Sequence, residues 1–333
     1  MRAWIVDDPG PIDSRPLTLV DRPLPEPGPS QVRVRISVCG VCRTDLHLAE
    51  GDLPARRHGV VPGHEIVGVV DALGSDTARL ALGQRVGVAW LGATDGTCRY
   101  CRAGRENLCT SPTFTGWDVD GGYADYCLAE AAFAYALPDD LDDEQAAPLL
   151  CAGIIGYRAL KLAEVPPGGR LGIYGFGGSA HLTAQIALVQ GLEVHVLTRG
   201  EHNRQLALEL GCASAGGSHD EAPVRLDGAI LFAPAGDLVP VALRALDRGA
   251  TLATAGIWLS DVPSLVYEDE LFYERRLRSV TANTRQDGEE LMRIAPRLGV
   301  KATTVPYPFD DADRALADLA AGAFSGAAVL RVT

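Results

Sequence analysis

Three cysteines lie close together in the stretch TDGTCRYCRAGRENLC, which runs from residue 94 to residue 109. Cys98, Cys101 and Cys109 follow the spacing C-x2-C-x7-C, and Asp95 precedes the first of them with two residues between. Thiolates at such a spacing are typical of a tetrahedral zinc site, in which a carboxylate oxygen can be the fourth ligand. Three readings stay open: a zinc site with one oxygen ligand, a site that has lost its metal, or a loop rich in cysteine.

A second group of metal-ligand residue types comes from three separate segments. VCGVCRTDLH contains Cys39 and Cys42, PGHEIVG contains His64, and PLLCAGI contains Cys151. Cys, His and Cys from three segments could form a catalytic zinc site, which uses three protein ligands and keeps a fourth position open. Read without context, Cys39 and Cys42 could instead be a redox dithiol, and His64 could be a buried histidine.

The composition narrows the function classes. A chain of 333 residues predicts two domains, and a net charge of −13 argues against a nucleic-acid partner, because phosphate would be repelled. The opening MRAWIVDDPG has no long apolar run, so we expect neither a signal peptide nor a membrane span. Eight clustered cysteines favour metal binding in a reducing cytoplasm over a disulfide framework. These features suit a soluble enzyme that acts on small molecules.

The elements that must position these residues change in character along the chain. Residues 1–151 are predicted to be a β-rich domain, since QVRVRISV alternates apolar and polar residues, and HEIVGVVDAL and GQRVGVAW are further strand candidates. Residues 152–290 are predicted to be a doubly wound parallel sheet. The final segment, 291–333, reads as strand, helix and strand in KATTVPYPF, DDADRALADLAAG and AAVLRVT. The predicted fold class is therefore α/β.

The second domain begins with one clear βαβ unit, GGRLGIYGFGGSAHLTAQIALVQGLEVHVLT. Three further units follow in DGAILFA with VPVALRALDRG, then TLATAGI, then RSVTANT with GEELMRIAPRLG. The first unit carries Gly175, Gly177 and Gly178, with Ala180 at the last position of the pattern G-x-G-x-x-G/A. Between a strand and a helix, these glycines predict a dinucleotide site with the pyrophosphate at the helix N-terminus. The alternative is an ordinary α/β turn.

The end of the next predicted strand bears on which dinucleotide would bind. An acidic residue there would bind the adenosine ribose and repel a 2′-phosphate, but this chain has Thr198 followed by Arg199. These two residues favour acceptance of NADP, with NAD still possible. The alternative is that Arg199 is only a solvent-exposed loop residue.

Taken together, these motifs resemble those of the zinc-dependent medium-chain alcohol dehydrogenases. The matching pieces are GVCRTDLH, GHEIVGVVDALG, the C-x2-C-x7-C loop, APLLCAGIIGYRAL and YGFGGSAH, in family order along essentially the whole chain. Within the family, the chain is most similar to the bacterial branch related to cinnamyl alcohol dehydrogenases and propanol-preferring enzymes. The resemblance implies a GroES-like catalytic domain, a Rossmann domain and a C-terminal segment, 291–333, that returns to the catalytic domain. It also implies a zinc cofactor, NADP or NAD, and an alcohol or aldehyde substrate.

The resemblance also implies a role for each matching residue. The implied ligands of a catalytic zinc are Cys42, His64 and Cys151, and those of a second, structural zinc are Asp95, Cys98, Cys101 and Cys109, with aspartate where most relatives have cysteine. The residues around the catalytic zinc would be Glu65 as a transient ligand, Asp45 orienting the histidine, Thr44 and His47 relaying a proton, Arg43 contacting pyrophosphate, and Trp90 and Trp117 lining the substrate pocket. Cys39, Cys127 and Cys212 match no ligand and are expected to be packing residues.

Two other functions remain as alternatives. A zinc-free quinone or enone reductase on the same fold would need no proton relay, and the set Cys42, His64 and Cys151 argues against it. A zinc-stabilised binding protein without catalysis would not need Thr44 and His47. The resemblance further implies a homodimer or homotetramer, with no nucleic-acid or membrane partner.

Overall fold

The computed structural model describes residues 1–332, and the chain divides into two compact units. Unit 1 contains residues 1–151, 282–296 and 301–333, and unit 2 contains residues 152–281 and 297–300. The chain thus leaves unit 1 after Cys151 and returns to it at residue 282, nine residues before the expected boundary at 291.

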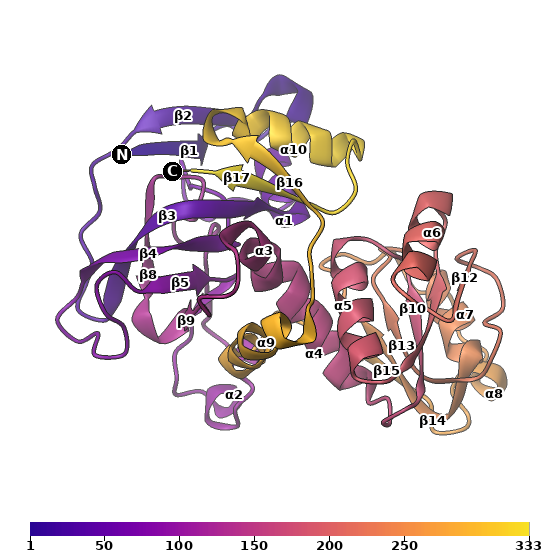
Figure 1. Cartoon of the computed structure of the whole chain (residues 1–333). Helices are drawn as coiled ribbons and strands as arrows, with labels where there is room; N and C mark the ends of the chain where they lie inside the picture. Colours follow the sequence, from indigo (N-terminus) through magenta and orange to yellow (C-terminus); the bar gives the residue numbers. More distant parts are fainter. Residues whose placement is uncertain (333) are drawn as a thin grey trace. The chain divides into compact units, whose positions relative to one another are not determined.

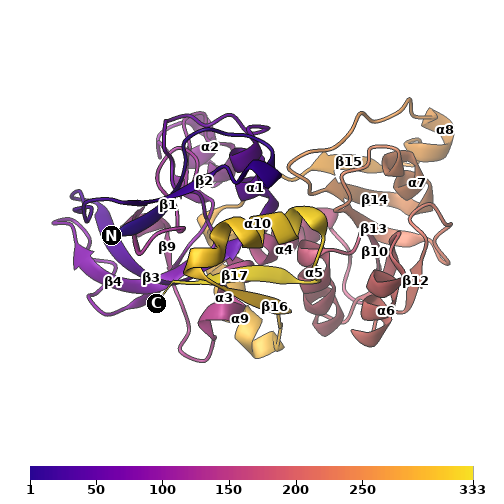
Figure 2. The ribbon, with the colours of Figure 1, turned by 90° about the horizontal axis from the view of Figure 1, so that it is seen from above.

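Unit 1 is built on a seven-stranded sheet that combines both ends of the chain. Its strand order is β16-β17-β3-β4-β5-β9, with β8 also paired to β3. The bounds are β3 Gln31–Val41, β4 Ile66–Leu73, β5 Arg85–Val88, β8 Tyr126–Glu130, β9 Ala134–Ala136, β16 Thr304–Pro308 and β17 Ala327–Arg331. Figures 1 and 2 show the C-terminal strand β17, in yellow, beside the N-terminal strand β3. The C-terminal strands therefore complete the sheet of unit 1.

Smaller elements of unit 1 surround this sheet. Two short antiparallel pairs are β1 Arg2–Val6 with β2 Leu17–Asp21, and β6 Leu91–Ala93 with β7 Thr113–Phe114. The helices are α1 Arg43–Glu50, α2 Arg99–Arg102, α3 Asp143–Pro148, α9 Arg285–Leu298 and α10 Ala312–Ala321, with short 3₁₀ turns at Ile12–Ser14, Glu106–Leu108, Ala131–Phe133 and Phe309–Asp311. Most of α9 thus belongs to unit 1.

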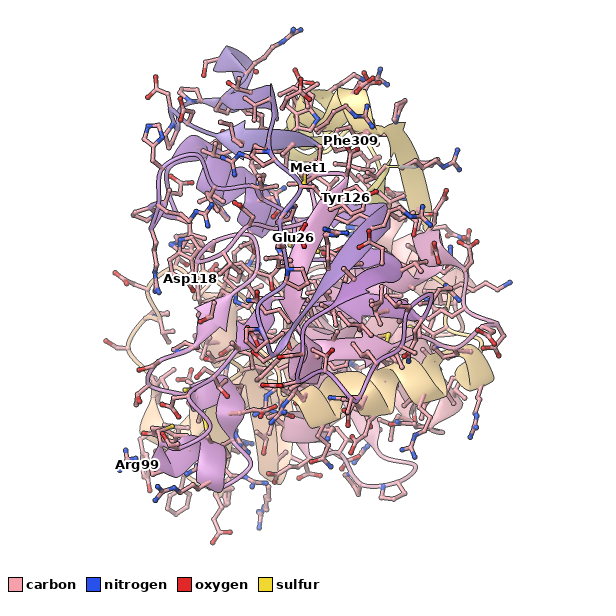
Figure 3. The ribbon with its side chains drawn as sticks, turned by 90° about the vertical axis from the view of Figure 1, so that its left-hand side faces the viewer. Met1, Glu26, Arg99, Asp118, Tyr126 and Phe309 are labelled. Carbon is pink, nitrogen blue, oxygen red and sulfur yellow. The ribbon has the colours of Figure 1, made fainter. Side chains whose placement is uncertain are left out.

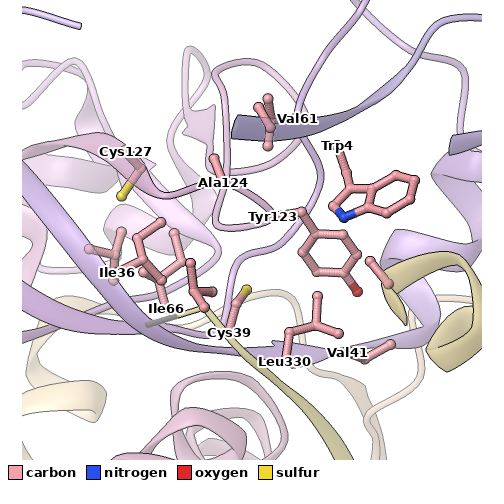
Figure 4. Packing of buried hydrophobic residues seen from close by; sticks show 14 of the residues in the cluster. Trp4, Ile36, Cys39, Val41, Val61, Ile66, Tyr123, Ala124, Cys127 and Leu330 are labelled. Carbon is pink, nitrogen blue, oxygen red and sulfur yellow. The ribbon is translucent and has the colours of Figure 1, made fainter. Parts of the chain in front are cut away.

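The core of unit 1 follows from the alternation seen in the sequence. Along β3, Val32, Val34 and Ile36 are completely buried and face one side of the sheet, because alternate side chains of a strand share a face. They pack with residues from both ends of the chain, including Trp4 and Leu330. Figure 4 shows part of this cluster, which also contains two of the cysteines predicted to be packing residues, Cys39 and Cys127.

Unit 2 is a six-stranded parallel sheet in the order β12-β11-β10-β13-β14-β15. The strands are β10 Arg170–Tyr174, β11 Glu193–Leu197, β12 Ser214–Gly216, β13 Leu226–Leu231, β14 Leu246–Thr254 and β15 Arg276–Ser279. The helices are α4 Ile154–Ala163, α5 Gly178–Val189, α6 Glu201–Glu209, α7 Leu238–Ala245 and α8 Tyr267–Glu270. Numbered along the chain, the order 3-2-1-4-5-6 is that of a Rossmann fold, which confirms the predicted fold class.

Two sequence expectations for unit 2 were wrong in detail. Strand β14 begins at Leu246, five residues before the predicted strand, because α7 ends at Ala245 and leads into it directly. The helical pattern after RSVTANT does not continue the parallel sheet. The side chain of Asn283 donates to the Tyr135 hydroxyl at 3.2 Å, and Arg285 binds Glu106, so this segment belongs to unit 1.

One helical stretch within residues 1–332, Asp143–Ala163, is long and apolar enough to cross a membrane by length and composition. Of its most apolar window, 61% is buried inside the protein. It comprises α3, a π-helical turn at Leu149–Gly153 and α4, and it buries Leu149, Leu150 and Ile154. Core helices of folded proteins meet the same criterion, and this burial pattern is that of a core helix.

Candidate active site

Four of the predicted site residues meet in unit 1. The ligand atoms of Cys42, His64, Glu65 and Cys151 all lie within 4.8 Å of one another. The two sulfur atoms of Cys42 and Cys151 are 3.9 Å apart. Two thiolates bound to one tetrahedral zinc at about 2.3 Å would lie about 3.8 Å apart, so the donor set and its spacing fit this metal.

Helix α1 positions the first of these residues. Cys42 is the N-cap of α1, and the carboxylate of Asp45 accepts a hydrogen bond from the Cys42 backbone N–H at 2.9 Å, which forms a capping box. The first turn of the same helix carries Thr44, whose hydroxyl lies 3.7 Å from the Cys42 sulfur. Cys42 and Thr44 therefore lie close together because both are at the N-terminal end of helix α1.

Asp45 also fixes the orientation of His64. Its Oδ1 atom lies 3.2 Å from Nδ1 of His64 and accepts from the backbone N–H of Gly63 at 2.9 Å. Since an ionised carboxylate can only accept, Nδ1 of His64 carries a proton and Nε2 is left free to bind a metal. Asp45 and His64, which the sequence grouped, are thus in direct contact.

Cys151 lies in the π-helical turn Leu149–Gly153 between α3 and α4. Such turns often occur at functional sites, because the inserted residue changes the direction of one side chain within a helix. The hydrogen bond with Cys151 holds the pKa of Cys42 well below its ordinary value, against the effect of burial and with further help from His64. The same hydrogen bond and burial raise the pKa of Cys151.

His64 and Glu65 are buried, and the pKa values of both side chains are shifted. Burial, and then the charge of Cys42, raise the pKa of Glu65 well above its ordinary value. Burial acts to lower the pKa of His64, but the Asp45 carboxylate and the Cys42 thiol together outweigh it, and the pKa is raised. A Cβ at Gly40 would lie 1.9 Å from a carboxylate oxygen of Glu65, so glycine at this position makes room for Glu65. Sequence analysis did not identify Gly40.

Cys39 does not take part in the site. It is completely buried among Tyr123, Ile66 and other core residues, as Figure 4 shows, and burial raises its pKa. Its sulfur contacts the Gly40 carbonyl at 3.5 Å, whereas the Cys42 sulfur meets Cys151. This arrangement argues against the redox dithiol.

An aromatic cluster adjoins the histidine. Trp90 meets His64 edge to face at a ring separation of 5.0 Å and stacks on Phe114 and Trp117 at 4.9 and 5.9 Å. The guanidinium of Arg56 lies 3.9 Å from the centre of the Trp117 ring. Trp90 thus contacts His64, and Trp117 stacks on Trp90. Phe114, three residues before Trp117, was missed because a single phenylalanine gives no signal in the sequence.

The loop residues form a second cluster. The ligand atoms of Asp95, Cys98, Cys101 and Cys109 lie within 4.8 Å of one another, and the sulfurs of Cys98 and Cys101 are 3.6 Å apart. One oxygen of Asp95 accepts from the backbone N–H groups of Thr97 and Cys98, each at 2.8 Å. Figure 3 labels Arg99 on the short helix α2, which begins just after Cys98 at the edge of unit 1.

Backbone hydrogen bonds lower the pKa values of two side chains in the loop cluster, Asp95 and Cys98. The N–H groups of Cys98 and Thr97 hold the pKa of Asp95 well below its ordinary value. Backbone hydrogen bonds from Cys101 and Thr110 lower the pKa of Cys98 to about 7, whereas desolvation raises that of Cys101 to about 11. Zinc binds its ligands in their deprotonated forms, and the lowered pKa values of Asp95 and Cys98 favour those forms.

The predicted relay and phosphate residues are also on α1. Arg43 is exposed, and His47 is one turn further along, where its Nδ1 lies 3.1 Å from the Asp52 carboxylate. His47 is about one-third exposed, with 33% of its side chain accessible, whereas Thr44 is buried. Helix α1 therefore carries both Thr44, which is buried, and His47, which is partly exposed.

In unit 2, the glycine turn has the predicted context. Gly175 has a φ of +86°, and a Cβ there would lie 2.8 Å from the backbone nitrogen of Ala233. A Cβ at Gly177 or Gly178 would meet no atom within 4 Å, so the start of helix α5 is open to a ligand. Thr198 at the end of β11 is buried, and Arg199 is exposed.

Comparison with known proteins agrees with this geometry. Residues 28–139 match the alcohol dehydrogenase GroES-like domain. The chain is 56% identical to a probable alcohol dehydrogenase, AdhA, of Mycobacterium tuberculosis (strain CDC 1551 / Oshkosh), over 100% of this chain and 97% of that protein. It is 33% identical to an alcohol dehydrogenase of Geobacillus stearothermophilus, over 96% and 97% of the two chains. Its fold is similar to that of a cinnamyl alcohol dehydrogenase from Sorghum bicolor, with a TM-score of 0.89, 27% identity and coverage of 99% and 97%. The chain therefore belongs to the alcohol dehydrogenases, oxidoreductases that act on alcohols.

Proposed function

We propose that this protein is a zinc-dependent alcohol dehydrogenase that transfers hydride reversibly between a primary or secondary alcohol and NAD(P), with an aldehyde or ketone as the other product. The observation that carries the proposal is the meeting of Cys42, His64 and Cys151 beside the hydroxyl of Thr44. These three side chains would hold the metal, and Glu65 is within reach of the same position.

The chain's own residues supply the remaining requirements of the reaction. Bound zinc would act as a Lewis acid that lowers the pKa of a hydroxyl by many units. Asp45 holds His64 in the tautomer that presents Nε2. Thr44 would accept the proton of the substrate alcohol while it releases its own hydroxyl proton outward. His47 would be the outer group that passes a proton to solvent, since an imidazole exchanges protons readily near neutral pH. Trp90 and Trp117, with Phe114, would form an apolar wall that keeps water from the reacting carbon.

The direct test is a panel of primary, secondary, aliphatic and aromatic alcohols with both cofactors, run together with metal analysis. Alcohol-dependent reduction of either cofactor by protein that contains zinc would support the proposal. Full activity in zinc-free protein, with reduction of C=C bonds, would favour the quinone or enone reductase. Binding of nucleotide without turnover of any alcohol would favour the non-catalytic protein.

The relay can be tested through its pH dependence. In His47→Gln, we expect alcohol oxidation at pH 7 to fall, because the proton leaves less easily, and to recover towards the wild-type rate at high pH, where hydroxide accepts it. General acid–base groups contribute about 10²–10⁴-fold, and an outer member of a relay contributes less. Asp52→Asn is the matched control, since it removes the partner of His47 but keeps the imidazole. Identical pH profiles of kcat for wild type and His47→Gln would contradict the relay.

Cofactor choice is tested at Arg199, because its side chain is exposed whereas that of Thr198 is buried. We propose that Arg199 pairs with the 2′-phosphate of NADP. In Arg199→Ala, kcat/KM for NADP should fall about tenfold, or ~1.4 kcal/mol, while that for NAD stays the same. An unchanged ratio of the two values would show that Arg199 does not contact the 2′-phosphate.

We also propose that Asp95, Cys98, Cys101 and Cys109 bind a second zinc with a structural role. The loop is tied to the rest of unit 1 by Glu106, just before Cys109, which accepts hydrogen bonds from Arg285 at 2.7 and 3.0 Å. Arg285 also lies over the ring of Phe133 at 4.6 Å. An ordered loop would therefore help to hold the start of helix α9.

Asp95→Ala should lower the zinc content from two ions per chain towards one and lower the Tm, because one ligand and its two backbone hydrogen bonds are lost. Atomic emission and calorimetry measure both quantities. Asp95→Cys is the matched control and should bind the loop zinc at least as well as wild type, since it restores four thiolates. One zinc per chain in wild-type protein prepared without chelator, all of it lost on mutation of Cys42, would show that the loop binds no metal.

We propose that the protein is a cytoplasmic homodimer or homotetramer. All eight cysteines are free thiols, as expected in a reducing compartment. Strand β15 ends the sheet of unit 2 with four exposed residues, and exposed apolar side chains lie near it in sequence, among them Ile257, Trp258 and Phe272. Pairing of this edge with a second copy would cover both features. A monomeric mass in sedimentation equilibrium would contradict this assembly.

A further inference from the structure

The carboxyl ends of the strands in unit 2 are joined by backbone hydrogen bonds. The N–H of Gly175, after β10, donates to Leu197 at the end of β11 at 2.8 Å. The N–H of Thr198, after β11, donates to Gly216 at the end of β12 at 2.9 Å. On the other side, Ala233, after β13, donates to the carbonyl of Tyr174 at 3.1 Å. The ends of four strands are thus connected in the order of the sheet.

One side-chain contact joins the two outer loops of this series. His219, in the loop after β12, lies with its Nε2 2.9 Å from Oδ2 of Asp237, in the loop after β13. Strands β12 and β13 are not neighbours, because β11 and β10 lie between them. At about 4.8 Å per strand, their ends are separated by about 14 Å. The His219–Asp237 bridge therefore reaches from one side of the β10 and β11 ends to the other.

Hydrogen bonds hold the bridge in place on both sides, at His219 and in the loop of Asp237. The hydroxyl of Ser218, which is 8% exposed, lies 3.1 Å from Nδ1 of His219. Because an ionised Asp237 can only accept, Nε2–H of His219 donates to it, and in the neutral imidazole Ser218 donates to Nδ1. On the other side, the backbone N–H of Gly236 donates to the Ser260 hydroxyl at 2.8 Å, which holds the loop that carries Asp237.

Ser218, His219 and Asp237 share residue types with a hydrolytic triad, but their arrangement does not suit nucleophilic attack. Ser218 is adjacent to His219 in the chain and is buried, whereas the other two side chains are more than half exposed, at 59% and 63%. The serine therefore orients the imidazole, and the exposed part of the cluster is the His219–Asp237 pair.

We propose that the His219–Asp237 bridge is a clasp that positions the adenosine half of the dinucleotide. This inference rests on the proposed use of NAD(P) and names residues for one end of that ligand. The open glycine turn after β10 would take the pyrophosphate, and in a Rossmann fold the ligand lies outside the carboxyl ends of the strands. The adenosine half then extends over the ends of β10 and β11, which is the space that the bridge spans.

The chemistry of the two side chains matches an adenine ring. An adenine offers a flat aromatic face and an exocyclic amino group that donates hydrogen bonds. The imidazole of His219, held by Ser218 and Asp237, offers a flat face of its own. Oδ2 of Asp237 is engaged by His219, and its second oxygen, Oδ1, can accept from the amino group. The nicotinamide half of the cofactor would make no use of these groups.

The test compares binding of 5′-AMP, NAD, NADP and nicotinamide mononucleotide to the full-length protein and to His219→Ala and Asp237→Ala, by isothermal titration calorimetry. We expect Kd for 5′-AMP and for both dinucleotides to rise about five- to tenfold in each variant, while Kd for nicotinamide mononucleotide stays the same. Asp237→Ala should not disturb α7, because the Asp237 side chain makes no capping hydrogen bond. Glu164→Gln is the matched control, since it breaks an exposed ion pair with Arg276 elsewhere in unit 2.

Three results would overturn the clasp. Unchanged affinity for 5′-AMP in both variants would show that the bridge does not touch adenosine. Equal weakening of all four ligands, or the same weakening in Glu164→Gln, would indicate general destabilisation of unit 2. Failure of the wild-type protein to bind any of the nucleotides would contradict the proposed use of NAD(P), and with it the clasp. This result can be told apart from the other two because it concerns the wild-type protein.

Discussion

Cys42→Ser is expected to abolish alcohol oxidation, with a loss of at least about 10³-fold in kcat, because the site loses one of its three ligands and with it the metal. A Lewis acid contributes several kcal/mol to a transition state that develops charge on oxygen, and each 1.36 kcal/mol corresponds to a factor of ten. The variant should keep its fold, since serine can still accept at the start of α1. It should also bind NAD(P), because the glycine turn belongs to unit 2.

The matched control for this variant is Cys39→Ala, three residues earlier. Cys39 is buried in the core and makes no contact with Cys151 in the structure. We therefore expect Cys39→Ala to retain zinc and turnover, with some loss of stability from the missing sulfur. Loss of activity in Cys39→Ala and retention in Cys42→Ser would reverse our assignment of the two thiols.

Thr44→Val is expected to have the second-largest effect. Valine has nearly the shape of threonine but lacks the hydroxyl that lies 3.7 Å from the Cys42 sulfur, so the substrate proton has no acceptor. We expect kcat for alcohol oxidation to fall about 10²–10⁴-fold at neutral pH, with zinc content unchanged.

Thr44→Ser is the companion variant, because it keeps the hydroxyl and removes only a methyl group. Its kcat should remain within a few-fold of wild type, and comparison of the two variants separates the hydroxyl from packing at this buried position. Equal losses in Thr44→Val and Thr44→Ser would assign the effect to packing and contradict the relay.

The sequence was sufficient to group the residues of both candidate metal sites, the loop residues by their spacing and Cys42, His64 and Cys151 through resemblance. Cys42, His64 and Cys151 come from distant segments, and only their order within a recognisable set of motifs connected them. Residue spacing could not show that Cys151 occupies a π-helical turn, since this depends on how α3 and α4 join. Asp95 was recognisable because its distance from Cys98 is short and lies within one loop.

The features that the sequence did not predict depend on contacts between distant residues. Arg285 and Glu106 are 179 positions apart, so the pattern of α9 looked like one more helix of the parallel sheet. Phe114 stacks on Trp90, and Gly40 leaves room for Glu65, so neither contribution can be recognised from the residue type alone. The His219–Asp237 bridge joins loops after strands that are not adjacent, which no local pattern can reveal.

The central claim is that Cys42, His64 and Cys151 hold a zinc ion in an enzyme that oxidises alcohols. The most direct test is anomalous diffraction at the zinc edge, from crystals of protein whose alcohol-dependent reduction of NAD(P) has been measured on the same preparation. We expect an anomalous peak about 2.3 Å from the sulfurs of Cys42 and Cys151 and about 2.0 Å from Nε2 of His64. Active protein with no peak at this position, or with a peak only in the loop at Asp95, would contradict it.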